Sequence, residues 1–235
     1  MYTTRDVTVC IKTFERPHCL AECVKHIRKR YPDIQIIVVD DSNTPGRNEH
    51  VDKYLSLPYD SGLSAGRNFA LKHVSTPLAM IIDDDTMFIK DKCIENMLEV
   101  YNSSDEINLV AGRLFPNKRH EWHGKFIMND DLELHFRKSD NSIAGHAIYD
   151  FVINLFIADT KTLQENPWRE ELKIAEHTEW FWRVRDKMKC TICDAAMFKN
   201  TSDKSNPEYA KMRQRKQFWK KQSDAIGVRR LILKR

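Results

Sequence analysis

Leu78-Ala-Met-Ile-Ile82 runs directly into Asp83-Asp84-Asp85. The apolar run predicts a buried strand. Three consecutive carboxylates at its end are hard oxygen ligands of the kind that Mg²⁺ or Mn²⁺ prefers. Because adjacent like charges repel each other, a bound cation accounts for their being together better than structure alone does. The alternative is a solvated acidic turn or a helix N-cap, for which one Asp is sufficient. We therefore predict a divalent ion at this turn.

Three more apolar runs precede this strand, and amphipathic stretches alternate with them. We predict strands at Val7–Ile11, Ile34–Val39 and Tyr54–Leu57, and helices at Pro17–Arg30 and about Ser64–Val74. This alternation indicates an α/β fold with a mostly parallel sheet flanked by helices. Ligands of such sheets bind at the carboxyl ends of the strands. The residues that follow the strands there are polar except for Phe14: Thr13, Phe14, Glu15 and Arg16 come after the first strand, and Asp40, Asp41 and Ser42 after the second.

The second half of the chain has a different pattern, in which strands follow one another without helices between them. The apolar runs are Leu109–Phe115, Lys125–Met128, Leu132–Arg137 and Tyr149–Ala158, and helices are expected at Ala175–Met188 and from Pro207 to about Lys221. We see no linker between the halves. We predict a single domain with a nucleotide-sugar-binding lobe (about 1–105), a mixed-strand acceptor lobe (about 106–205) and a basic C-terminal helix and tail (206–235).

Composition limits the class of protein. Of 235 residues, 41% are hydrophobic and 31% charged, which is enough for a packed globular core. No run of 18 apolar residues occurs, and residues 1–7 hold no apolar signal segment. We therefore expect a soluble, cytoplasmic protein or the soluble part of a longer one.

The net charge of +4 is concentrated at the C-terminus. Residues 211–235 hold ten Lys and Arg but one acid, whereas residues 1–210 have a balance of −5. We expect this segment to pack its aromatic side chains on the body of the protein. Peripheral contact with an anionic membrane is the alternative. Because the body is acidic and no nucleic-acid-binding motif occurs, we do not expect nucleic acid as a partner.

Two helix starts carry further polar groups. Gly62-Leu-Ser-Ala-Gly66-Arg67-Asn68 opens a helix whose first N–H groups are able to face a phosphate, and Arg67 adds positive charge. Glu176-His177-Thr178-Glu179 opens another, where a carboxylate suits either the helix dipole or a general base. Since neither GxxxxGK[ST] nor GxGxxG occurs, we expect a nucleotide here to be held by a metal rather than by a glycine loop.

Five motifs in a fixed order identify a family. VCIKTFERP, VVDDS, SGLSAGRN, IIDDD and AEHTEWFWR resemble the nucleotide-sugar-dependent glycosyltransferases of the GT-A fold, family-2-like. The first two, together with Tyr149–Thr160 and the run on to Glu179, are similar to the N-acetylgalactosaminyltransferases that build gangliosides. The resemblance spans about residues 7–200.

The resemblance implies an inverting transfer from a UDP-sugar to a hydroxyl of a glycan or lipid-linked acceptor, with Mn²⁺ or Mg²⁺. The residues that it implies for the donor are Thr13, Phe14, Glu15, Arg16, Asp41, Arg67, Asn68, Asp83 and Asp84. Asp83–Asp85 corresponds to the DxD motif, in which the first acid often meets the ribose and the last binds the metal. The resemblance implies Asp83 and Asp85 as the metal site. A His that often completes the metal shell near Lys199 or Asn200 is missing here.

The general base stays open at this point. The family has an Asp of a Glu-Asp pair where this chain has His177, so Glu176, His177 and Glu179 are all candidates, with Glu176 preferred. Two other functions remain as alternatives. A sugar nucleotidyltransferase would need a glycine-rich basic loop after the first strand, which Thr13–Arg16 is not. A nucleotide-sugar-binding module would bind the donor without turnover.

Overall fold

The computed structural model describes residues 1–115, 122–201 and 206–234. Its helices are α1 Pro17–Arg30, α2 Leu63–Leu71, α3 Cys93–Tyr101, α4 Thr160–Glu165, α5 His177–Val184, α6 Pro207–Arg213 and α7 Gln217–Ile226. Its longer strands are β1 Val7–Thr13, β2 Gln35–Asp40, β3 Lys53–Ser56, β4 Leu78–Asp83, β5 Thr86–Phe88, β6 Leu109–Leu114, β7 Lys125–Met128, β8 Leu132–His135, β11 Phe156–Asp159, β12 Cys190–Asn200 and β13 Leu231–Lys234. The two-residue strands β9 Ser142–Ile143 and β10 His146–Ala147 form a small hairpin.

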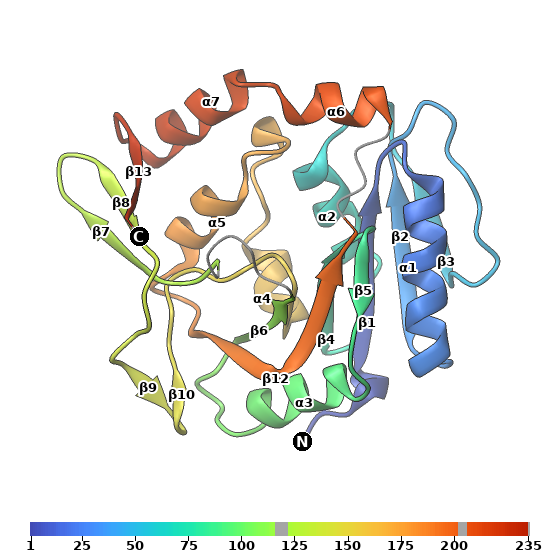
Figure 1. Cartoon of the computed structure of the whole chain (residues 1–235), viewed down its shortest axis with the longest axis horizontal. Coiled ribbons are helices and arrows are strands. Elements are labelled where there is room, and N and C mark those ends of the chain that lie inside the picture. Colours follow the sequence, from blue (N-terminus) through green and yellow to red (C-terminus); the bar gives the residue numbers. More distant parts are fainter. Residues whose placement is uncertain (116–121, 202–205, 235) are drawn as a thin grey trace.

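One large sheet organises the molecule (Figure 1). Within the described residues it has eight strands in the order β3-β2-β1-β4-β11-β6-β12-β5. Strands β3, β2, β1 and β4 are parallel to one another, as predicted for the first half. Strand β11 is antiparallel to both β4 and β6, so the second half of the sheet is mixed. The prediction of an α/β sheet flanked by helices, with mixed strands in the second half, is confirmed.

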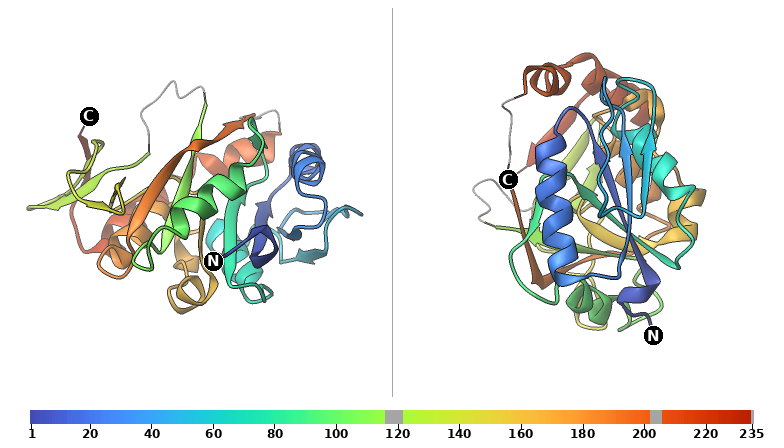
Figure 2. Two further views of the ribbon diagram at one scale, coloured as in Figure 1. Left: turned by 90° about the horizontal axis from the view of Figure 1, so that it is seen from below. Right: turned by 90° about the vertical axis from the view of Figure 1, so that its right-hand side faces the viewer.

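Helices cover both faces of this sheet (Figure 2). Because alternate residues of a strand point to opposite faces, the buried side chains of β1 divide between two cores. Val9 and Ile11 pack with apolar residues of α1 and α3. Cys10 packs on the other face with residues of α2, α4 and α5. The carboxyl ends of the parallel strands stay uncovered by these helices, which is where ligands of such sheets bind.

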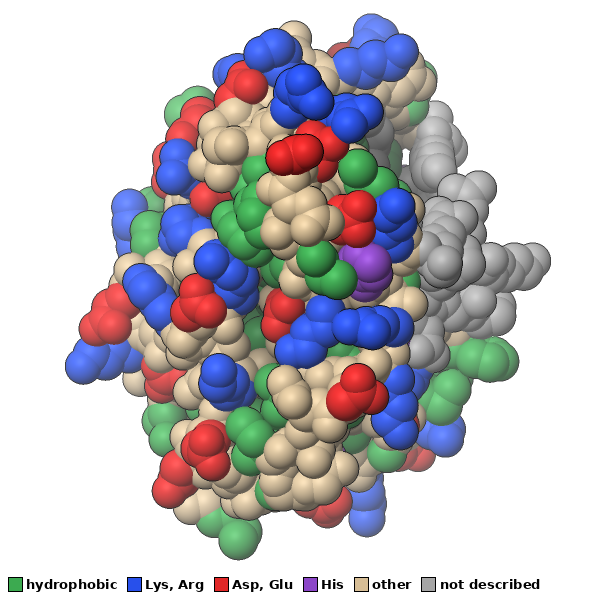
Figure 3. All heavy atoms as spheres, turned by 90° about the vertical axis from the view of Figure 1, so that its left-hand side faces the viewer, with side chains coloured by type: hydrophobic (Ala, Val, Ile, Leu, Met, Phe, Trp, Pro, Cys, Tyr) green, Lys and Arg blue, Asp and Glu red, His purple; other side chains and the backbone are tan. Residues whose placement is uncertain are grey.

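The C-terminal segment packs on the rest of the protein. Strand β13 adds to a three-stranded sheet with β8 and β7, parallel to β8. On α7, Phe218 and Gln222 are buried, and the Gln222 side chain donates to the Ala175 backbone oxygen at 2.6 Å. Trp219 is half exposed. Figure 3 shows Lys and Arg side chains gathered toward the end of the molecule where α7 lies, with acids among them. Membrane contact by this segment stays a prediction, and its Arg235 lies outside the described residues.

Several predicted elements differ from the structure. The helix predicted from Pro207 to Lys221 is two helices, α6 and α7, because the chain turns at residues 214–216, where Arg215 reaches the body at Asp60. In the apolar run Tyr149–Ala158 only the last residues join the sheet, as β11. Helix α3 and strand β12 were not predicted. The buried residues of α3 have helical spacing, at Cys93, Ile94, Met97 and Leu98, whereas β12 mixes apolar and polar residues without strict alternation.

The proposed lobes share the large sheet. The strands of residues 106–205, namely β11, β6 and β12, lie between β4 and β5, which both belong to residues 1–105. The division into lobes of a single domain stays a prediction. Among the described residues, no helix is long and apolar enough to cross a membrane.

Candidate active site

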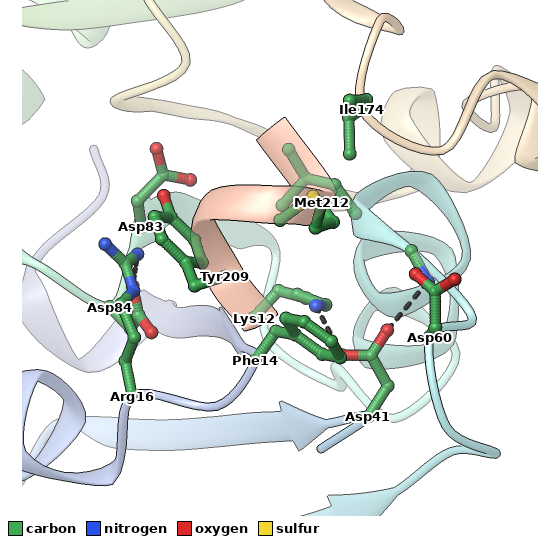
Figure 4. Close-up of a pocket in the computed structure, with 12 residues that line it drawn as sticks. Lys12, Phe14, Arg16, Asp41, Asp60, Asp83, Asp84, Ile174, Tyr209 and Met212 are labelled. Carbon is green, nitrogen blue, oxygen red and sulfur yellow. Dashed lines mark hydrogen bonds and ion pairs between the residues drawn. The ribbon is translucent and has the colours of Figure 1, made fainter. Parts of the chain in front are cut away.

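A small cavity lies at the carboxyl ends of β1, β2 and β4 and is covered by α6 (Figure 4). It holds about 40 Å³. Its lining contains predicted donor residues together with residues from two other segments: Lys12, Phe14, Arg16, Asp41, Asp60, Gly62, Leu63, Asp83, Asp84, Ile174, Tyr209 and Met212. The convergence of strand ends expected from the parallel sheet is therefore present.

The floor of the cavity is a buried ion pair. Lys12 Nζ, at the end of β1, donates to Asp41 Oδ1, and Lys12 lies 5.0 Å from the centre of the Phe14 ring. Burial lowers the pKa of Lys12, and the neighbouring Asp41 opposes this. The second oxygen of Asp41 accepts from the Gly62 N–H at 2.7 Å. Asp41 is completely buried, so it holds Lys12 and the start of α2 in place.

Arg16 lies between two of the three aspartates. Its guanidinium donates to Asp84 Oδ1 and, at 3.0 Å, to Asp85 Oδ2. The other oxygens accept as well: Asp84 Oδ2 from the Thr13 hydroxyl at 2.7 Å, and Asp85 Oδ1 from Asn200 Nδ2 at 2.8 Å. Burial raises the pKa of Asp84 to about 7, against the opposing effect of Arg16.

These contacts leave few carboxylate oxygens free to coordinate a metal ion. Both oxygens of Asp84 and of Asp85 already accept hydrogen bonds from protein donors. Over residues 1–115, 122–201 and 206–234, no group of three His, Cys, Asp or Glu is arranged to hold an ion. Asp83 is the most accessible of the three, with its side chain 41% exposed. The residues do not fit a preformed metal site, and the predicted ion at Asp83 and Asp85 stays a prediction.

Arg67 joins the aspartates to the start of α5. It is buried in α2, and it donates to Asp83 Oδ1 at 3.2 Å and to Glu176 Oε1 at 2.6 Å. Asn154, just before β11, donates to the same Glu176 oxygen at 3.1 Å. The structure thus brings Arg67, Asp83 and Glu176 together, although they come from three separate motifs. No role was predicted for Asn154.

Two other predicted donor residues have structural contacts instead. Asn68 lies on the side of α2 away from the cavity, where it exchanges hydrogen bonds with the backbone of Trp168 at 2.8 and 2.9 Å. The Glu15 carboxylate accepts from the Asn43 N–H at 2.7 Å and ties the ends of β1 and β2 together. Neither residue lines the cavity.

The start of α2 has a partner within the protein. The N–H groups of Leu63 and Ser64 both donate to the Lys173 backbone oxygen, at 3.0 and 3.2 Å. Gly62 has a φ of +100°, and a Cβ there would approach Lys173 to 2.9 Å, so a side chain would be strained and would clash. A phosphate at this helix start, as expected from the sequence, would compete with the Lys173 carbonyl.

The three candidate bases point in different directions. Glu176 precedes the first residue of α5 and reaches Arg67 at the cavity. Glu179 is buried on another side, where Arg169 and Arg183 donate to its Oε1 at 2.9 and 3.0 Å. The i, i+3 spacing does not bring the two carboxylates together, because Glu176 pairs with Arg67 whereas Glu179 pairs with Arg169 and Arg183.

His177 lies beside aromatic rings, 5.7 Å from Trp122 and 5.0 Å from Phe181 between ring centres. Its Nε2 is buried and has no hydrogen-bond partner among the described residues. Burial, together with the nearby positive charge of Arg67, lowers the pKa of His177 to about 3. The imidazole is therefore neutral at physiological pH and a poor proton acceptor.

Helix α6 supplies cavity residues that sequence reasoning missed. The Tyr209 ring lies 3.8 Å from the Arg16 guanidinium carbon, and Met212 lines the same cavity. At the ends of this segment, Asn206 donates to the Glu15 backbone oxygen at 2.8 Å, and Arg215 shares Asp60 with Lys173. The only sequence signal for these cavity residues was the presence of aromatic side chains among the C-terminal basic residues. It predicted that the segment packs on the body, but not that it covers the cavity.

Solved structures share this fold. The segment 1-349 of TarS from S. aureus, in complex with UDP-GlcNAc, superposes with a TM-score of 0.65 at 15% identity and covers 91% of this chain and 63% of that chain. Full TarS gives a TM-score of 0.61 over 93% of this chain and 39% of that one. Likeness at this identity concerns the fold alone, and it confirms the predicted GT-A fold.

Curated relatives and a family model agree with this. Beta-1,4 N-acetylgalactosaminyltransferase 2 of Mus musculus is 32% identical over 183 residues, and beta-1,4 N-acetylgalactosaminyltransferase 1 of Homo sapiens is 27% identical over 188 residues. Each match covers 74% of this chain and 35% of the relative, so the chain spans about a third of their length. The model of Glycosyl transferase family 2 matches residues 8–160. The chain belongs to glycosyltransferase family 2.

Proposed function

We propose that this chain transfers a sugar from a UDP-sugar to a hydroxyl of a glycan or glycolipid acceptor, with inversion at the anomeric carbon. Family membership supports the reaction class. The names of the curated relatives favour an N-acetylhexosamine as the sugar. The observation that carries the proposal is the buried Arg67, which links Asp83 in the cavity to the carboxylate of Glu176.

The donor is proposed to bind in the cavity beneath α6. The Phe14 ring lies 5.6 Å from that of Tyr59, and this pair offers an apolar surface for the uracil. Asp83 is the accessible acid and suits the ribose hydroxyls. Arg16 and Asp84 line the same cavity, and Thr13 supports them by donating its hydroxyl to Asp84. Asp41 acts indirectly by holding Lys12.

Glu176 is the proposed base. It takes the proton of the acceptor hydroxyl as that oxygen bonds to the anomeric carbon from the face opposite the donor phosphate. The bond from that carbon to the phosphate oxygen breaks, and its electron pair leaves with UDP. Arg67 and Asn154 hold Glu176 through one oxygen, Oε1. His177, neutral and next to Trp122, is proposed to contact the acceptor.

Glu179 has a supporting part in this proposal, because its paired Oε1 holds Arg169 and Arg183. Asn68 and Glu15 likewise support the loops around the cavity. No step is assigned to a divalent ion, since the oxygens of Asp84 and Asp85 are already paired.

Glu176→Gln tests the base. The amide keeps the shape but cannot take a proton, so kcat should fall by about 10²–10⁴-fold while the Kd for UDP stays near the wild-type value. Glu171→Gln, which changes an exposed glutamate upstream of α5, is the matched control and should keep full turnover. UDP-GalNAc and UDP-GlcNAc should both be offered, and the anomeric configuration of the product determined by NMR.

Other outcomes separate the alternatives. Near-normal turnover by Glu176→Gln would remove Glu176 from the chemistry, and retained configuration would contradict inversion. Binding of a UDP-sugar with no transfer or hydrolysis would leave a nucleotide-sugar-binding module. Release of pyrophosphate from UTP and a sugar phosphate would identify a nucleotidyltransferase.

A further inference from the structure

We propose that basic side chains of this chain do the work of a divalent ion, so that the nucleotide binds without metal. This inference rests on the proposed UDP-sugar transfer. In this proposal the two electrostatic roles of the ion fall to different residues. Arg16 neutralises the acids at the end of β4, and Lys173 with Arg215 receives the charge of the diphosphate.

The first task is visible in the contacts of Arg16. Its guanidinium bridges Asp84 and Asp85, and all three residues are at least 95% buried. The planar guanidinium matches the geometry of carboxylates better than a point charge does. Thr13 and Asn200 complete the hydrogen bonds of the two carboxylates. Asp84 and Asp85, the acids that would attract a metal cation, are therefore already paired with the positive charge of Arg16.

A metal ion at Asp85 would have to displace this arrangement. Hard divalent ions take six or more oxygen ligands, and the Asp85 oxygens are held by Arg16 and Asn200. Pulling Asp85 away would leave a buried guanidinium with one carboxylate fewer, and loss of a partner from a buried ion pair is strongly unfavourable. Competition between ion and arginine thus favours the arginine.

The second task falls to two cations that share one acid. Lys173 Nζ lies 3.2 Å from Asp60 Oδ2, and Arg215 donates to the same oxygen. Asp60 lines the cavity. Among these three groups two positive charges face one carboxylate, so one positive charge is in excess beside the part of the cavity that Asp60 lines. A guanidinium pairs with phosphate through two N–H groups, and positive charge fixed in place stabilises the leaving UDP as the glycosidic phosphate bond breaks.

The decisive measurement is UDP binding to the full chain by calorimetry, with EDTA and then with Mn²⁺ or Mg²⁺. We expect the Kd values for UDP in EDTA and with metal to agree within about threefold, which is well below a tenfold change in affinity. UDP binding that needs Mn²⁺, or that weakens tenfold or more in EDTA, would overturn the inference while leaving the proposed function intact. If UDP binds under neither condition, the proposed function fails as well.

Arg16→Gln provides the second arm, and Arg16→Lys is its charge-conserving control. Gln leaves Asp84 and Asp85 without their cation, so UDP binding should become dependent on Mn²⁺, and Mn²⁺ alone should now raise the melting temperature. UDP binding by Arg16→Lys should stay metal-independent.

Lys173→Gln and Arg215→Gln should each weaken UDP binding about tenfold, equally with metal and with EDTA. Unchanged affinity in both would remove them from the diphosphate site. The wild-type comparison decides the inference even if Arg16→Gln does not fold.

Discussion

Arg67 shows how one buried side chain connects separate parts of the site. It reaches from α2 to Asp83 at the end of β4 and to Glu176 before α5, a partner 109 positions away in sequence. A guanidinium can serve two carboxylates because its donors are fixed in one plane. Arg67 and Glu176 are both buried, so loss of either partner of that pair is costly, whereas the Asp83 side chain is 41% exposed. The donor end and the proposed base are therefore held in one geometry.

His177 gives a residue-scale prediction about pH. Its pKa is about 3 in the folded protein because burial and Arg67 disfavour the charged form, against about 6.5 when unfolded. Between these values the unfolded state binds a proton that the folded state does not. The folded protein therefore loses stability as pH falls below about 6.5, by up to about 1.4 kcal/mol per pH unit from this group.

His177→Gln removes that contribution. The free energy of unfolding should fall less steeply between pH 7 and pH 4 in the variant than in the wild type, measured by urea denaturation at each pH. His50→Gln, at an exposed histidine, is the control and should keep the wild-type slope. Parallel curves for His177→Gln and wild type would contradict a neutral His177 imidazole in the folded protein.

Helix α6 determines access to the site at the scale of elements. The helical segment is interrupted at residues 214–216, so α6 lies over the cavity while α7 packs elsewhere on the body. A cavity of about 40 Å³ is far smaller than the roughly 300–1,000 Å³ that small-molecule sites occupy. We infer that α6 moves away when the donor enters.

Tyr209→Ala tests this movement. The ring lies 3.8 Å from the Arg16 guanidinium carbon, a cation–π contact worth about 0.5–2 kcal/mol. Without it the covered state is less populated, so the association rate for UDP should rise several-fold as the open fraction grows. Stopped-flow fluorescence measures the rate. Trp219→Ala, on the exposed side of α7, should leave it unchanged. An unaltered rate in Tyr209→Ala would mean that α6 does not limit entry.

The large sheet unites the chain at the scale of the molecule. Strand β11 is inserted between β4 and β6, so the edge of the parallel half is completed by a strand from the second half. Each half alone would expose an unpaired apolar strand, which is an aggregation hazard. The expected lobes should therefore unfold together.

Two probes check this cooperativity. Trp168 and Trp180 are buried in the second half, so their fluorescence reports on residues 106–205, whereas circular dichroism reports on all helices and strands. The two urea transitions should coincide. Residues 1–105 expressed alone should show no cooperative transition. Separate transitions, or a stable isolated first half, would show that the lobes are independent domains.

Much of the fold was predictable because it depends on local pattern. The run Leu78–Ile82 is apolar at every position and is buried as β4. The alternation of strands and helices before it defines a parallel sheet, and the carboxyl ends of such strands meet at one edge. Phe14 and Asp83 could therefore be assigned to one site from the sequence, and the order of the five motifs was enough to indicate the family.

Only the tertiary structure decided which polar groups meet. Arg16 and Asp84 pair across 68 positions, and Tyr209 comes from the far end of the chain to cover them. Glu176 and Glu179 are three residues apart yet face different partners, because α2 brings Arg67 to Glu176 while Arg169 and Arg183 lie beside Glu179. The physical reason is that a buried charge takes whichever opposite charge the packing brings to it, and packing depends on contacts between distant segments that local sequence patterns do not encode.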